Sequence, residues 1–114
     1  MPTVEITVRL APGASAPGAA ITLRAQVEEV GPADAPARVV AREVVRGVLL
    51  NEPRQLSLEV AEPNPTRRYT VRVHADVDGS GLVAVHDLVS TRSHPVLTLG
   101  GPNTITVELS PASP

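Results

Sequence analysis

Residues 69–77 read YTVRVHADV, and apolar and polar side chains alternate through this stretch more regularly than anywhere else in the chain. The apolar positions are Tyr69, Val71, Val73, Ala75 and Val77. Because successive side chains of a β-strand point to opposite faces of the sheet, this period of two predicts a strand with one buried face. The turn sequence Asp78-Gly79-Ser80-Gly81 follows, and residues 82–89 are predicted to return as the second strand of a hairpin.

The same alternation predicts further strands at 3–10, 21–27, 56–60, 96–99 and 105–109. Residues 38–48 are ambiguous, because their valines fit a helical period of 3.6 about as well as a strand. We interpret this segment as a strand because it is short, rich in valine and bounded by Pro36 and Gly47. About eight short strands separated by turns are typical of an all-β sandwich or barrel.

The composition agrees with an all-β protein. The chain has 114 residues, the size of one domain, so we predict a single domain over residues 1–110 and a flexible tail over 111–114. Twelve Pro and eight Gly divide it into short pieces. With no Trp or Phe, the core must consist of Val, Leu, Ile and Ala around Tyr69, the single aromatic residue, which we expect to pack near a strand start with its hydroxyl bonded to a loop. We predict a two-sheet β-sandwich of about seven to eight strands.

Charge and terminal sequence limit the function classes. The formal net charge is −2 and the arginines are scattered along the chain, which argues against nucleic-acid binding. No stretch approaches the roughly 20 apolar residues that a membrane span requires. The absence of Cys excludes disulfides and cysteine-ligated zinc. The first residues contain neither a signal-peptide pattern nor a lipidation cysteine, so we expect a cytoplasmic protein unless a leader was removed. The sequence does not indicate an oligomeric state.

Several motifs occur together and in order. They are VEEV at 27–30, ADAPARVVA at 33–41, YTVRV at 69–73, HPVLT at 94–98 and GGP at 100–102. In this combination the chain resembles the bacterial family that contains the YbaY lipoproteins and the YscW-type lipoprotein chaperones, or pilotins, of type III secretion. Members of that family typically carry a similar ADAPA stretch and a similar PVLT segment before a glycine.

The resemblance covers most of the chain and implies an immunoglobulin- or transthyretin-like sandwich that binds a protein partner. It implies no catalytic residue. His94 stands where many members have Tyr, and the chain departs from the lipoprotein members in lacking a signal sequence and a lipidation cysteine.

Residues 76–87 also read like a calcium loop. Oxygen ligands fall at loop positions one, three, five, seven and twelve, and Gly81 occupies the sixth position, where such loops turn sharply. These ligands are Asp76, Asp78, Ser80, the Leu82 carbonyl and Asp87. Calcium is therefore a candidate cofactor, with micromolar to millimolar affinity expected, and its role would be to stiffen a long hairpin.

Other interpretations of the same residues stay open. Asp-Gly-Ser-Gly between two strands is also an ordinary hairpin turn whose acids keep it soluble. His74 and His86 could meet across the hairpin near Asp76 or Asp87 and hold zinc. The chain shows no Gly-x-Ser-x-Gly elbow or comparable catalytic signature.

The sequence therefore favours two functions over catalysis. The first is a non-enzymatic interaction or chaperone-like module that binds an unknown protein partner, with strand addition at an exposed edge as a candidate mode. The second is a calcium-stabilised structural domain. A hydrolase or metal enzyme has the weakest support.

Overall fold

The computed structural model describes residues 2–31, 36–61, 63–64, 66–92, 94–97 and 103–112. In these residues the chain is all-β, as predicted, and contains no helix. The strands are β1 (Thr3–Leu10), β2 (Ile21–Val30), β3 (Arg38–Val48), β4 (Arg54–Glu59), β5 (Arg68–Asp76), β6 (Leu88–Ser90), β7 (Pro95–Val96) and β8 (Thr104–Pro111). The ambiguous segment 38–48 is a strand, which confirms that interpretation.

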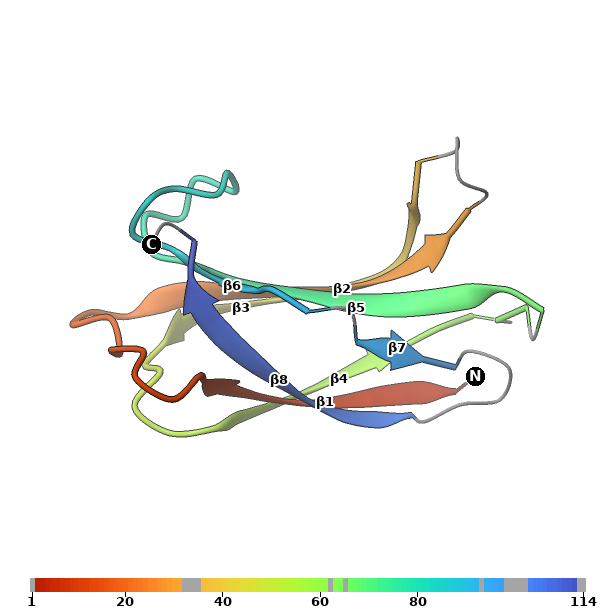
Figure 1. Ribbon diagram of the computed structural model, residues 1–114, viewed down its shortest axis with the longest axis horizontal. Helices are drawn as coiled ribbons and strands as arrows, with labels where there is room; N and C mark the ends of the chain where they lie inside the picture. The colour runs from red at the N-terminus through yellow and green to blue at the C-terminus, as the bar shows by residue number, and fades with distance from the viewer. Residues whose placement is uncertain are drawn as a thin grey trace.

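All eight strands belong to one sheet, with the order β3-β2-β5-β6-β8-β1-β4 and with β7 paired to β5. Figure 1 shows that this sheet folds over, so that β3, β2 and β5 face β1 and β4. The predicted two separate sheets are therefore one continuous, barrel-like sheet. The reason is β8, which pairs in parallel with β1 along its length and antiparallel with β6 at its C-terminal end.

The core lies between the two facing layers and is built from the alternating apolar residues. Val71 and Val73 on β5 are buried, as are Val4 and Ile6 on β1, and all four belong to one core cluster. Tyr69 is also buried, and its hydroxyl accepts a hydrogen bond from the Asn64 N–H at 2.7 Å. The predicted packing role of Tyr69, with its hydroxyl bonded to a loop, is thus confirmed.

The predicted hairpin after β5 is wrong in one respect. Residues 77–87 form a long loop, and the return strand β6 begins only at Leu88. The physical reason is that Asp87, immediately before β6, turns inward to bind the loop backbone, so residues 82–87 cannot continue the ladder. Figure 1 shows this loop projecting above the outer face of the β2–β5 layer.

The end of the chain also differs from its prediction. β8 extends to Pro111, and the Ala112 N–H donates a hydrogen bond of 2.9 Å to the Asp87 carbonyl, where a flexible tail over 111–114 was expected. Of the predicted strand 96–99, the structure shows β7 at Pro95–Val96, and residues 98–99 lie outside the described residues. Much of the ADAPA motif (33–35) and all of GGP (100–102) also lie outside them.

Candidate functional site

Two fully buried carboxylates stand at the two ends of the loop 77–87. Asp76, the last residue of β5, is 0% exposed, and Asp87, just before β6, is 1% exposed. A buried carboxylate is tolerated only when its oxygens accept hydrogen bonds. Both residues therefore depend on donors that the loop and the neighbouring strands bring to them.

Asp76 binds the first half of the loop. Its Oδ1 accepts the Gly79 N–H at 3.0 Å, and its Oδ2 accepts the Gly81 N–H at 2.7 Å and the Arg24 Nε–H at 3.0 Å. Burial opposes ionisation of Asp76, but the bonds from Gly81 and Arg24 outweigh it and hold the pKa of this carboxyl below its ordinary value. Gly79 and Gly81 have φ values of 73° and 84°, a left-handed backbone that favours glycine.

Asp87 binds the second half. Its Oδ1 accepts the Val77 N–H at 2.9 Å, and its Oδ2 accepts the Ala84 N–H at 2.9 Å. His74 Nε2 lies 2.6 Å from the same Oδ2 and donates to it. Burial again opposes ionisation, and the bonds from His74, Ala84 and Val77 outweigh it, so the pKa of Asp87 is lowered.

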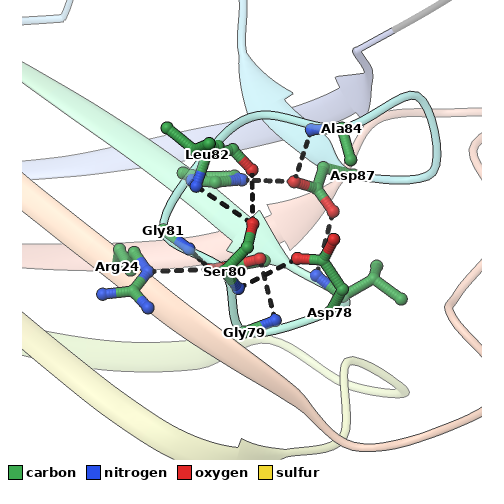
Figure 2. A network of polar contacts seen from close by, with 11 residues as sticks. Arg24, Asp78, Gly79, Ser80, Gly81, Leu82, Ala84 and Asp87 are labelled. Atoms are coloured by element: carbon green, nitrogen blue, oxygen red, sulfur yellow. Dashed lines mark hydrogen bonds and ion pairs between the residues drawn. The ribbon is translucent and has the colours of Figure 1, made fainter.

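The remaining members of the predicted calcium set lie on the exposed side of the loop. Asp78 Oδ1 accepts the Ser80 N–H, and Ser80 Oγ both accepts the Leu82 N–H and donates to the Leu82 carbonyl. Figure 2 shows this network, with Asp78 and Ser80 bonding within the loop. Their oxygens thus act as acceptors in local turns, as Asx and serine turns do.

The structure brings a different group together. Ligand atoms of His74, Asp76 and Asp87 lie within 4.8 Å of one another, the one such cluster among the described residues. Arg24 adds a positive charge at Asp76, and the His74 Nε2 is already bonded to Asp87. His86, the other half of the predicted zinc pair, is exposed and outside the cluster. Calcium at Asp76, Asp78, Ser80, Leu82 and Asp87 stays a prediction.

A groove of about 380 Å³ adjoins the loop on the outer face of the sheet. Its floor comes from side chains that cross-strand pairing places in two rows. The rows are Val44–Arg24–His74–Val89 and Arg42–Gln26–Arg72, and Gly81, Val83 and Ser90 complete one wall. The arginines are far apart in sequence, and only the sheet register gathers them. Their positions in alternating strands are therefore the one signal of this groove in the sequence.

Strand β3 lies at one end of the sheet and has a free edge among the described residues. The direction of the N–H groups of β3 follows from the pairing of β5 with β2. On β5, the Val73 N–H donates to Ser90 Oγ at 3.0 Å and therefore points away from β2. In an antiparallel ladder Ala25, which lies opposite Val73 on β2, must then direct its N–H towards β3, so Glu43, which lies opposite Ala25, directs its backbone groups towards β2. The next residue, Val44, therefore directs its N–H towards the free edge.

A protein of known structure shows a similar fold. An alternative pilotin from the type II secretion system of Vibrio cholerae superimposes with a TM-score of 0.71 and 19% sequence identity, covering 94% of this chain and 93% of that chain. At this identity the likeness concerns the fold alone. No curated protein sequence matches the chain. No helix among the described residues is long and apolar enough to cross a membrane.

A family model described as type III secretion system lipoprotein chaperone (YscW) matches residues 1–109. This match confirms the resemblance drawn from the motifs. It also shows that the expected cytoplasmic location is wrong, because the family consists of lipoproteins, which a covalent lipid holds at a membrane. The expectation rested on the first residues of the chain, which are no guide to an anchor. The chain belongs to the family of type III secretion system lipoprotein chaperones, YscW.

Proposed function

We propose that this protein is a non-enzymatic chaperone-like module that binds a protein component of a bacterial secretion system. Family membership over residues 1–109 is the observation that carries the proposal. The similarity of its fold to a type II secretion pilotin is consistent with it. Among the described residues, His74 forms a hydrogen bond with Asp87 and none with a serine hydroxyl. This arrangement does not support a serine hydrolase.

The proposed mode of binding is strand addition at β3. This edge strand has eleven residues and presents the Val44 N–H outward, so a partner strand could extend the sheet by pairing with it. β4, the strand at the other end of the sheet, has six residues and offers a shorter template. The two facing layers of the sheet support the finer resemblance to an immunoglobulin- or transthyretin-like sandwich, which stays a prediction.

The test uses a proline on the free edge. Val44→Pro removes the outward N–H without breaking the pairing of β3 with β2, and Val44→Ala is its matched control, because it also loses the branched side chain but keeps the N–H. The full chain and both variants are immobilised and used to capture proteins from cells of the source bacterium. We expect a secretion-system component to bind the parent and Val44→Ala and to be lost with Val44→Pro.

Two results would contradict this proposal. If the captured proteins include no secretion component, the proposed function is wrong. If Val44→Pro captures the same component as well as Val44→Ala does, the partner binds elsewhere and strand addition at β3 is wrong.

A calcium-stabilised structural role is the second candidate. The approach of the Asp76 and Asp87 carboxylates at one end of the sheet supports it. The loop is already closed without an ion, since both carboxylates accept backbone N–H groups from it. A calcium titration, described below, decides this alternative.

A further inference from the structure

The groove on the outer face of β2, β3 and β5 has a charge that contrasts with the rest of the molecule. The chain has a formal net charge of −2. The groove nevertheless contains three arginines, Arg24, Arg42 and Arg72, and none of its described lining residues is acidic. A cleft lined by one sign of charge concentrates ligands of the opposite sign.

Each of these arginines keeps donors available. Arg24 uses Nε to bind the buried Asp76, and Arg72 uses Nε to bind Glu28, both at 3.0 Å. Their terminal Nη groups make no hydrogen bond to another described residue, and the same holds for the whole Arg42 guanidinium. Asp76 and Glu28 thus hold two guanidinium groups in place, while their terminal nitrogens stay open to a further acceptor.

The loop beside the groove carries exposed apolar side chains. Leu82, Val83 and Val85 in the loop 77–87 are 76%, 62% and 65% exposed, and Val83 lines the groove. Large apolar side chains gathered at an exposed site mark interaction surfaces. The buried carboxylates Asp76 and Asp87 hold the backbone of the loop that carries these apolar side chains. Little conformational entropy is therefore lost when a partner covers the loop.

We propose that this groove binds an acidic, amphipathic segment of the protein partner. Its carboxylates contact Arg24, Arg42 and Arg72, and its apolar side chains cover Leu82 and Val83 of the loop. The inference rests on the proposed function, since it names the chemistry of the partner. It concerns the face of the sheet, whereas a strand would add at the edge of β3. Val44 belongs to both, because its side chain lines the groove and its N–H points to the edge.

The test compares two synthetic peptides that share the same leucine positions and differ only in carrying Glu or Lys at every polar position. Each is titrated into the ¹⁵N-labelled full chain, and amide chemical shifts are followed. We expect the Glu peptide to shift the signals of Arg24, Arg72 and Val83, and the Lys peptide to leave them unchanged. Equal binding of both peptides, no binding of the Glu peptide at millimolar concentration, or shifts mapping to other residues would overturn the proposal.

Arg42→Glu and Arg46→Glu form a matched pair of variants. Both arginines are exposed on β3 and both substitutions change the net charge equally, but only Arg42 lines the groove. We expect Arg42→Glu to weaken binding of the Glu peptide by about tenfold or more, and Arg46→Glu by less than about twofold, because only the first places a like charge in the site. Equal weakening by both variants would show that the peptide responds to net charge alone, and it would overturn the proposed binding in the groove.

Three further outcomes separate this inference from the proposed function and from binding to a membrane. If a captured secretion component is lost with Val44→Pro but kept by Arg42→Glu, the groove proposal falls and strand addition stands. If the Glu peptide binds the groove but no secretion component is captured, the proposed function falls and the groove stands. If phosphatidylglycerol vesicles shift the Val83 signals and the Glu peptide does not, the occupant is a lipid surface and the peptide proposal is wrong.

Discussion

His74 Nε2 on β5 lies 2.6 Å from Asp87 Oδ2, a bond that joins the sheet to the far end of the loop 77–87. The same oxygen accepts the Ala84 N–H, and the other oxygen of Asp87 accepts the Val77 N–H. One carboxylate therefore fixes both ends of the loop to the strand beneath it. Asp76 does the same for the first turn of the loop.

Removing a buried loop carboxylate should destabilise the protein. Asp76→Ala removes a fully buried carboxylate and leaves the N–H groups of Gly79 and Gly81 and the Arg24 guanidinium without their acceptor. We expect a loss of about 3 kcal/mol in the free energy of unfolding, measured by urea denaturation. Asp78→Ala is the control, because Asp78 is exposed, and it should cost less than about 1 kcal/mol. Equal losses for both variants would contradict the role given to Asp76.

Stability should fall at acidic pH through Asp87. Its folded-state pKa lies below the ordinary value of 3.8, because the bonds from His74, Ala84 and Val77 outweigh the effect of burial. The unfolded state therefore binds a proton first as the pH drops, so stability is fully present above the ordinary pKa and is lost as the pH falls through the folded pKa. Urea denaturation between pH 7 and pH 3 measures this loss. Asp87→Asn, which cannot ionise, should reduce the acid sensitivity, and an unchanged pH profile would contradict the assignment.

Gly79 should resist substitution because of its backbone. Its φ is 73°, and an added Cβ meets no atom within 4 Å, so the cost of Gly79→Ala is conformational strain alone. We expect a loss of about 1–2 kcal/mol by thermal or urea unfolding. Gly18 is the matched control, since it also has open space around it but no positive φ, and Gly18→Ala should be neutral or slightly stabilising. A larger effect at Gly18 than at Gly79 would contradict this interpretation.

If the protein is a chaperone-like module and not a calcium-stabilised domain, calcium should leave the melting temperature unchanged. The loop 77–87 is closed by N–H donors and by the positive charge of Arg24 at Asp76, which competes with a cation for the same oxygen. Thermal melts in millimolar calcium and in chelator measure the effect, with sodium chloride of matched ionic strength as the control. A rise in Tm that saturates with calcium and disappears in Asp78→Ala would instead establish the calcium-stabilised alternative.

The order of the strands along the chain was largely predictable. The period of two at 3–10, 21–27 and 69–77 follows from the burial of one face of each strand, a local property that each segment carries by itself. The predicted hairpin after β5 is wrong for a physical reason. The sequence pattern indicates that Asp87 is a ligand or a solvated acid, whereas Asp87 is buried and binds the loop backbone. Burial of an acid depends on donors elsewhere in the fold, which no local pattern displays.

The sequence by itself determined that the chain is all-β, with strands made from alternating valines and leucines, and its motifs identified the family. Only the tertiary structure decided that the sheet is continuous through β8, that Asp76 and Asp87 face inward, and that Arg24, Arg42 and Arg72 share one groove. Alternation fixes which face a side chain occupies relative to its neighbours in sequence. The pairing register between distant strands fixes which residues meet, and that register is set by the packing of the whole sheet.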